Sequence, residues 1–321
     1  MKIDVIIPTY HPQKRFLELV ERLEDQTEPV NRIIIVNTEK EGFAELMDCE
    51  AFCHTHPKAE LFHIPKESFD HGGARNMAVR RSDADFFVCM TQDALPADRY
   101  LIENLMKTLL GRDGTAAAYA RQLAEDDCSL IERYTRQFNY PEQEFYKSKA
   151  DIGRMGIKTY FCSNVCAVYR REIFEELGGF ASPTIFNEDM ILAAKAVQAG
   201  YSIGYAAKAQ VVHSHNYSGW EQLTRNFDLG VSHAQYPEVF EGVPPEGEGM
   251  KLVKQTAGYL LKKAPWFLPK LVWQSGMKWL GYRLGKGYER LPGRLVVFLS
   301  MQKGYWRKTE KGAEFSQNKH R

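Results

Sequence analysis

Two acidic side chains lie where a carboxylate can take part in catalysis. Asp93 follows the apolar strand that we predict at residues 85–90, within Thr91-Gln92-Asp93-Ala94-Leu95-Pro96. An acid at the carboxyl end of a parallel strand can bind a divalent cation that holds a diphosphate. Asp189 belongs to a Glu188-Asp189 pair at the start of a predicted helix, where a carboxylate can accept the proton of an attacking hydroxyl. The structural alternatives are an exposed loop acid at Asp93 and first-turn acids that stabilise their helix.

Asp189 also meets the charge requirement of a general base. The ordinary aspartate pKa of about 4 leaves the side chain ionised at neutral pH, and the helix dipole favours a negative charge in the first turn. We therefore expect Asp189 to be ionised, with a pKa close to its ordinary value.

Two further positions carry groups suited to phosphate or metal. Gly72 and Gly73 precede Arg75 and Asn76 at a predicted helix start, where backbone N–H groups and a guanidinium favour an anion. His213 ends a predicted strand, and a neutral imidazole there can complete a metal site or contact a diphosphate. The alternatives are an ordinary glycine-rich helix start and a surface histidine pair.

Strands and helices alternate along the chain. Predicted strands lie at residues 2–7, 32–36, 61–64, 85–90 and 202–212, with further strand segments between 116 and 169. Predicted helices lie at residues 41–52, 73–82, 99–110, 126–138, 188–199 and 220–234, and a further helix includes residues 16–23. This order predicts an α/β fold of three layers, with helices on both faces of a mostly parallel sheet. Parallel strands would bring the polar strand ends to one edge.

The end of the first strand excludes two large enzyme classes. Pro8-Thr9-Tyr10 stands where a dinucleotide fold needs G-x-G-x-x-G and where a P-loop needs G-x-x-x-x-G-K-[ST]. Dehydrogenases and P-loop kinases are therefore disfavoured. A sugar nucleotidyltransferase is disfavoured as well, because its glycine-rich basic loop is missing.

Five motifs in order give the chain a family resemblance. They are Pro8-Thr-Tyr10, Phe69-Asp-His-Gly-Gly-Ala-Arg-Asn76, Thr91-Gln-Asp-Ala-Leu-Pro96, Asn187-Glu-Asp189 before a helix ending Ala199-Gly-Tyr201, and His213-Ser-His215. Together they resemble the inverting family 2 glycosyltransferases with a GT-A fold, most closely the bacterial rhamnosyltransferase branch. The resemblance covers about residues 1 to 235.

The resemblance implies a nucleoside-diphosphate sugar donor and assigns roles to the matching residues. Asp93 would bind Mg²⁺ or Mn²⁺ at the diphosphate, with His213 as a further metal ligand. Asp189 would be the general base, with Glu188 on the acceptor side. The implied donor contacts are Pro8, Thr9, Tyr10, Arg75, Asn76 and Gln92.

Two departures from the family pattern affect these roles. The metal-binding element reads Thr91-Gln92-Asp93, with one carboxylate instead of two, which leaves both weak metal use and no metal use open. The second strand ends Asn37-Thr-Glu39, where relatives carry an acid that reads the base. Asn37 and Glu39 are rival candidates for that contact.

The C-terminal part of the chain is strongly basic. Residues 251–321 hold 16 Lys or Arg against three Glu, a net charge of +13, whereas the remaining 26 Lys or Arg and 38 Asp or Glu give −12. A helix after Pro269 would carry a polar stripe of Lys270, Gln274 and Lys278 beside a broad apolar face. We therefore predict a domain at 1–240, a linker at 241–250 and a helical region at 251–321 that associates with a membrane surface. The alternative is that this helix packs on the first domain. No motif supports nucleic-acid binding.

The predicted compartment is the cytoplasm. Met1-Lys2-Ile3-Asp4 enters a strand directly, so we expect no signal peptide, and six cysteines then read as free thiols. A zinc site at Cys49 and Cys53 is the minor alternative. No apolar run approaches the ~18 residues of a membrane span.

The predicted function is inverting transfer of a sugar, with L-rhamnose from dTDP-rhamnose as first choice. The implied acceptor is a hydroxyl of a lipid-linked surface polysaccharide or O-antigen precursor on a polyprenyl diphosphate, at the inner face of the plasma membrane. The alternatives are a UDP-hexose-dependent transferase of the same fold and an inactive nucleotide-binding or assembly partner.

Overall fold

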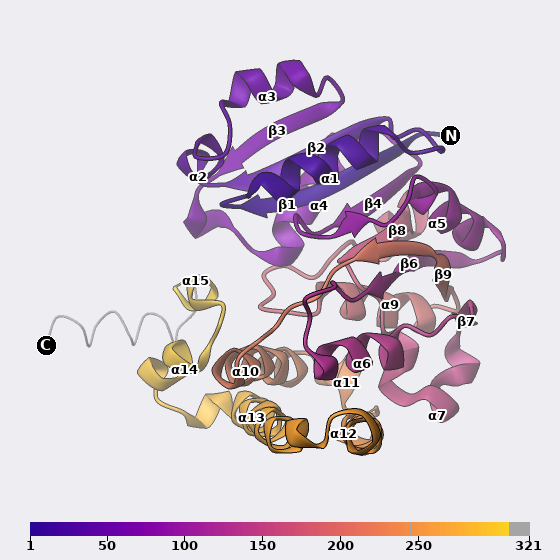
Figure 1. Ribbon diagram of the computed structural model, residues 1–321. Helices are drawn as coiled ribbons and strands as arrows, with labels where there is room; N and C mark the ends of the chain where they lie inside the picture. Colours follow the sequence, from indigo (N-terminus) through magenta and orange to yellow (C-terminus); the bar gives the residue numbers. More distant parts are fainter. Residues whose placement is uncertain (244–245, 308–321) are drawn as a thin grey trace, which may run out of the picture. The chain divides into compact units, whose positions relative to one another are not determined.

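The computed structural model describes residues 1–243 and 246–307 and divides into two compact units. The first unit contains Met1–Asp126, Asn139–Ser182 and Glu188–Ser214, and the second contains Asp127–Phe138, Pro183–Asn187 and the chain from His215 onward. Figure 1 shows a sheet with helices in the first unit and helices alone in the second.

The first unit is built on one mixed sheet of nine strands in the order β3-β2-β1-β4-β8-β6-β9-β5, with β7 paired to β9. The neighbours β3-β2-β1-β4 are parallel, as are β6 and β9, whereas β8 runs antiparallel to both β4 and β6. The α/β prediction is confirmed, with antiparallel pairing at β5, β7 and β8 as an added feature. The strands are β1 (Ile3–Tyr10), β2 (Arg32–Thr38), β3 (Ala59–Ile64), β4 (Phe86–Met90), β5 (Leu95–Pro96), β6 (Thr115–Leu123), β7 (Phe145–Lys147), β8 (Cys166–Arg170) and β9 (Ser202–Val212).

Helices cover both faces of this sheet because its strands are apolar on both faces. In β1, Ile3, Val5 and Ile7 join the core formed with α1 (Lys14–Glu24) and α5 (Leu101–Leu110). Ile6 is equally buried but lies outside that core, as the two-residue period of a strand requires. The other helical elements of this unit are α2 (Lys40–Ala44), α3 (Cys49–Thr55), η1 (Lys66–Ser68), α4 (His71–Arg81), η2 (Lys149–Asp151), α7 (Ile152–Met155), η3 (Gly156–Tyr160), α8 (Arg171–Glu176) and α9 (Glu188–Gln198).

One local prediction was wrong: the single helix expected at 41–52 is two helices. Asp48 accepts a hydrogen bond from the N–H of Ala51 at 2.9 Å and so caps the start of α3. The strand segments predicted between 116 and 169 correspond to β6, β7 and β8.

The second unit is a set of helices centred on the pair α10 (Gly219–Gln235) and α13 (Leu268–Lys286). Glycines allow the two backbones to come close: a Cβ on Gly281 would lie 2.1 Å from the carbonyl oxygen of Leu223, and one on Gly285 would lie 2.0 Å from that of Phe227. The other helices are α6 (Leu130–Asn139), α11 (Pro237–Phe240), α12 (Glu246–Lys263), η4 (Pro265–Phe267), η5 (Tyr288–Arg290), α14 (Gly293–Leu299) and α15 (Lys303–Trp306).

The predicted boundary at residues 241–250 does not coincide with these units. The last and longest segment of the second unit begins at His215, and residues 246–250 lie inside α12. The physical reason is the α10–α13 packing, which joins segments on either side of the predicted linker. Residues 308–321 of the predicted basic region lie outside the described part of the chain.

None of the helices within residues 1–243 and 246–307 has the length and apolarity needed to cross a bilayer. All six cysteines are free thiols, as predicted.

Candidate active site

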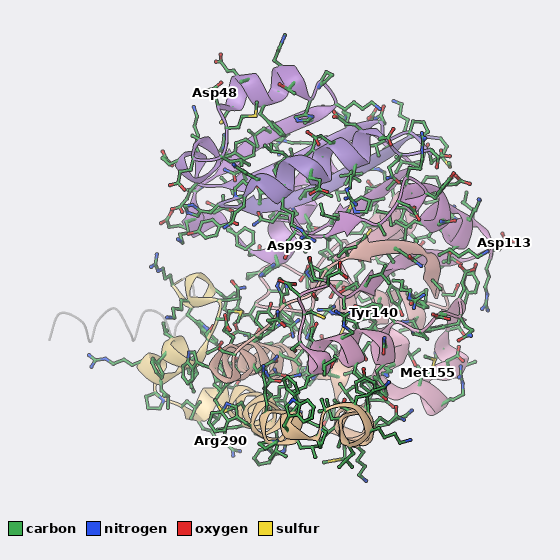
Figure 2. All side chains as sticks on the ribbon, viewed as in Figure 1. Asp48, Asp93, Asp113, Tyr140, Met155 and Arg290 are labelled. Carbon is green, nitrogen blue, oxygen red and sulfur yellow. The ribbon has the colours of Figure 1, made fainter. Side chains whose placement is uncertain are left out.

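The sheet brings Asp93 and His213 together although 120 residues separate them in the chain. Asp93 lies in the turn between β4 and β5 (Figure 2), and β5 pairs with the end of β9, where Leu95 lies opposite Val212. As a result, the Nε2 atom of His213 lies 3.5 Å from the Oδ2 atom of Asp93. His213 is buried, and its Nδ1 atom lies 3.2 Å from Oε1 of Gln122.

The chemistry of this pair fits a divalent cation. A carboxylate oxygen and an imidazole nitrogen are both ordinary ligands of Mn²⁺-type ions, and the partner at Nδ1 orients the imidazole so that Nε2 faces the acid. His215, two residues after His213 in the chain, is a third residue of a type that binds divalent metals. The predicted metal role of Asp93 and His213 stays a prediction.

Gln92 links two strand ends. Its Oε1 atom accepts a hydrogen bond from the N–H of Tyr10 at 2.8 Å, and its Nε2 atom donates to the carbonyl of Tyr10 at 3.1 Å. The amide therefore fixes the end of β1, with Pro8, Thr9 and Tyr10, relative to Asp93. A carboxylate could not make both bonds, because it has no donor.

The two rivals for the base contact differ in accessibility. Asn37 is fully buried; its amide accepts from Thr9 Oγ1 at 3.0 Å and donates to the carbonyl of Glu39 at 2.8 Å. The Glu39 side chain is about one-third exposed, with Lys66 at 3.6 Å. Glu39 also has a φ of +64°, which marks a constrained backbone. Of the two side chains, that of Glu39 is the one accessible from solvent.

The predicted donor ligands on α4 have partners inside the protein. The Nη1 atom of Arg75 lies 3.0 Å from Oε1 of Glu188 and donates to the carbonyl of His71 at 3.0 Å. The Asn76 amide makes two hydrogen bonds with the backbone of Phe180, at 2.9 and 3.0 Å. The structure thus pairs the predicted donor-side cation with the predicted acceptor-side acid.

Asp189 lies at the start of α9, beside Glu188, in a position fixed by backbone donors. Its Oδ2 atom accepts from the N–H of Asn164 at 2.9 Å, and its Oδ1 atom accepts from the N–H of Met190 at 2.8 Å. Burial first, and then the negative charge of Glu188, raise the pKa of Asp189 to about 7. The expectation of an ordinary pKa was wrong, because desolvation and a like charge outweigh the helix start.

Glu188 titrates in the opposite direction. Burial favours its neutral form, but Arg75, His71 and the amide of Asn164 together outweigh that effect and lower its pKa. Two adjacent acids therefore differ in charge behaviour: Glu188 stays ionised, and Asp189 can exchange a proton near neutral pH. Such divergence is typical of acid–base sites.

Asn164 is a site residue that the sequence did not reveal. It contacts both acids, since its backbone N–H binds Asp189 and its Nδ2 atom donates to Oε1 of Glu188 at 2.9 Å. The only signal in the sequence is a polar residue shortly before an apolar strand, and many loops have one.

The fold and this site define a glycosyltransferase of the GT-A type. The model of glycosyl transferase family 2 matches residues 4–178, and the chain belongs to this family, as predicted. It is 40% identical over 310 residues to the O-antigen chain rhamnosyltransferase RfbN of Salmonella typhimurium, covering 95% of this chain and 96% of the relative. Identity to the O-antigen chain rhamnosyltransferase WbaN of Salmonella anatum is 38% over 307 residues, with 94% and 95% covered.

A solved structure supports the fold. The mannosyltransferase PcManGT of Pyrobaculum calidifontis, in complex with GDP-Man and Mn²⁺, superimposes with a TM-score of 0.56 at 18% identity, covering 99% of this chain and 86% of that one.

Proposed function

We propose that this protein is an inverting rhamnosyltransferase that transfers L-rhamnose from dTDP-rhamnose to a hydroxyl of a lipid-linked O-antigen precursor. The proposal is supported by similarity over almost the whole length to two O-antigen chain rhamnosyltransferases. The observation in the structure that carries it is Asp189, a carboxylate held by two backbone donors with a pKa raised to about 7.

The proposed reaction is a single displacement. The acceptor oxygen forms a bond with the anomeric carbon of the sugar while the bond from that carbon to the diphosphate oxygen breaks. Asp189 takes the hydroxyl proton, and the nucleoside diphosphate leaves with the electron pair. Attack opposite the leaving group inverts the anomeric configuration, and a base with a pKa near the working pH serves this step best.

The donor side of the proposed site is the strand edge at Asp93. Asp93 and His213 would hold Mg²⁺ or Mn²⁺, which neutralises charge on the departing diphosphate. Gln92 fixes the backbone of Tyr10, and Glu39 is the accessible carboxylate for the base. Pro8, Thr9 and Tyr10 would lie under the base and ribose.

We also place the enzyme on the cytoplasmic face of the membrane, through the helical unit. Gln274, from the stripe predicted to be polar, is buried and donates to the carbonyl of Tyr217 at 3.0 Å. Three apolar residues of α13 are exposed instead: Val272 is 71%, Trp273 62% and Trp279 61% exposed. An exposed apolar helix face of this kind is typical of an interaction surface.

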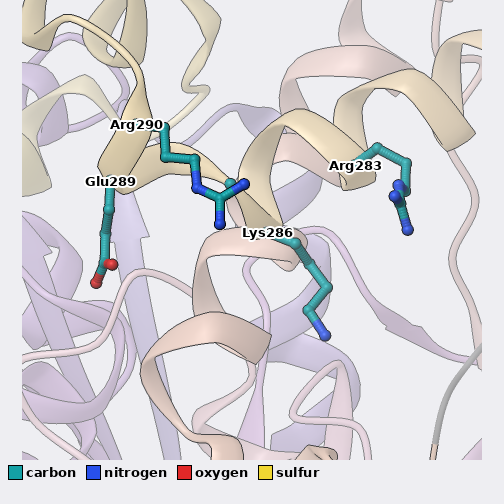
Figure 3. A pocket seen from close by; sticks show the side chains of 5 residues that line it. Arg283, Lys286, Glu289 and Arg290 are labelled. Atoms are coloured by element: carbon teal, nitrogen blue, oxygen red, sulfur yellow. The ribbon is translucent and has the colours of Figure 1, made fainter.

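Basic side chains lie at the C-terminal end of the same helix. A cavity of about 360 Å³ is lined by Arg283, Lys286, Gly287, Glu289 and Arg290, and Figure 3 shows the three basic side chains reaching from α13 and the turn after it. Apolar side chains with basic neighbours suit the interface of an anionic bilayer.

A transfer assay tests the proposed activity. Purified protein is incubated with a lipid-linked acceptor and either dTDP-rhamnose or UDP-hexoses, and the release of nucleoside diphosphate is measured. We expect turnover with dTDP-rhamnose. Turnover only with a UDP-hexose supports the alternative donor, and nucleotide binding without turnover supports the inactive binding partner.

Vesicle sedimentation tests the membrane surface. Trp273→Ala/Trp279→Ala should bind vesicles containing phosphatidylglycerol about tenfold more weakly than wild type. Leu110→Ala, which removes a similarly exposed apolar side chain from α5, serves as the control and should bind normally. Equal binding by all three proteins would refute the membrane surface.

A further inference from the structure

Arg75 and Glu188 form an ion pair that is almost completely removed from solvent. The two residues are 4% and 6% exposed, and their charged atoms lie 3.0 Å apart. A buried charge without a counter-ion is strongly unfavourable, so each of these side chains depends on the other. Arg75 also donates to the carbonyl of His71, which ties the guanidinium to the first turn of its own helix.

Asn164 connects this ion pair to Asp189. Its Nδ2 atom donates to Glu188 at 2.9 Å, and its backbone N–H donates to Asp189 at 2.9 Å. The orientation of the amide is fixed from the other side, because the hydroxyl of Tyr169 donates to Oδ1 of Asn164 at 2.7 Å. The ring of Tyr169 stacks on Phe87 in the sheet at 5.3 Å between centroids. A chain of contacts thus leads from the rigid sheet to Asp189.

We propose that Arg75, Glu188 and Asn164 form a buried positioning network for the general base Asp189, in which Arg75 is the counter-ion of Glu188 instead of a ligand of the diphosphate. The inference rests on the proposed role of Asp189. It assigns Arg75 to the acceptor side of the reaction, whereas the family motif that contains it suggests the donor side.

Glu188 and Arg75 are the charged groups that shift the pKa of Asp189 most. Burial raises the pKa of the Cys162 thiol to about 12 and raises the pKa values of Cys89 and Tyr169, so these groups are neutral. Burial also lowers the pKa of His71, whose imidazole is then neutral as well. Glu188 therefore favours the protonated form of Asp189, and Arg75 opposes it.

Three variants separate the two roles of Arg75. Arg75→Gln leaves Glu188 without its counter-ion, and we expect a kcat lower by about 100-fold, a lower Tm, and an unchanged Kd for dTDP-rhamnose. The double variant Arg75→Gln/Glu188→Gln removes both charges and should recover the Tm and part of kcat. Arg80→Gln removes an exposed cation from the same helix and serves as the control, with wild-type behaviour expected.

Glu188→Gln provides a readout that a purely structural role would not change. It removes the negative charge that raises the pKa of Asp189, so the acid limb of kcat/KM should move about 1 unit to lower pH. A donor Kd at least tenfold weaker in Arg75→Gln and not recovered in the double variant, or an acid limb unmoved in Glu188→Gln, would overturn the network. Failure of the base assignment itself appears separately, as an acid limb that persists in Asp189→Asn. If Arg75→Gln does not fold, the double variant and Glu188→Gln still decide the question.

Discussion

The surroundings of Asp93 and Asp189 show how one residue type acquires two kinds of chemistry. Asp93 is in an accessible turn, with 39% of its side chain exposed and an imidazole nitrogen at 3.5 Å. Asp189 lies beside the buried Glu188 and has a pKa raised to about 7. The first environment keeps the oxygens of a carboxylate available to a cation, and the second prepares a carboxylate to take up a proton.

This difference between the two acids arises from their neighbouring side chains and their exposure to solvent. An exposed acid beside a histidine offers a mixed oxygen and nitrogen ligand set, which suits a divalent ion. A half-buried acid beside a second, ionised acid holds a proton more strongly than it does in water. We therefore propose that Asp93 acts on the donor side and Asp189 on the acceptor side, and substitutions at each residue test this division.

The largest effect is expected for Asp189→Asn. The amide cannot accept a proton, so transfer should fall by about 1,000-fold, while the Kd for dTDP-rhamnose stays the same. Rates from a transfer assay and affinities from calorimetry check this. Asp113→Asn, at an exposed position, is the control. Substantial transfer by Asp189→Asn would remove Asp189 from the chemistry.

A smaller effect with a different signature is expected for Asp93→Asn. The loss of a charged ligand should weaken the response to Mn²⁺ and reduce transfer by about 100-fold. Raising the Mn²⁺ concentration should recover part of the rate in this variant and none in Asp189→Asn. Titration of both variants with Mn²⁺ makes the comparison. An unchanged Mn²⁺ response in Asp93→Asn would contradict the metal role.

Gln92→Ala should have a modest effect on donor binding alone. The substitution removes two hydrogen bonds that fix the backbone of Tyr10, and the KM for the donor should rise about fivefold. Gln92→Glu keeps one of the bonds and should show a smaller rise. A fall in kcat with an unchanged donor KM would argue against this positioning role.

The smallest effect on activity is expected for Tyr169→Phe. Loss of the hydroxyl leaves Oδ1 of Asn164 without its donor in a buried site, which should lower Tm by about 4 °C. The rate should fall only about threefold, because the backbone bond from Asn164 to Asp189 remains. Differential scanning fluorimetry and the transfer assay measure the two effects; an unchanged Tm would show that this bond adds nothing to the network.

Local patterns predicted much of the fold. The strand at 202–212 has the predicted bounds, and α10 differs from its prediction by one residue at each end. These elements are long and strongly patterned, so their burial can be read from residue type alone. The α2–α3 break was missed because a single carboxylate, Asp48, decides it. The two structural units divide the chain differently from the predicted domains, because the close packing of α10 and α13 depends on glycines distant in sequence.

The candidate site was only partly predictable. The proximity of Asp93 and His213 could be predicted, because both follow strands whose ends share one edge of the sheet. The ion pair between Arg75 and Glu188 could not be predicted, since it depends on how α4 and α9 pack together. The pKa of Asp189 was mispredicted for the same reason: desolvation is a property of the folded chain.

The pH dependence of transfer by the wild-type protein is the sharpest test of Asp189 as the general base. A base with a folded pKa of about 7 must lose its proton before it can act. We therefore predict that kcat/KM rises about tenfold per pH unit below pH 7 and levels off above it. A profile that is flat between about pH 5 and pH 8, as an ordinary aspartate gives, would contradict the claim.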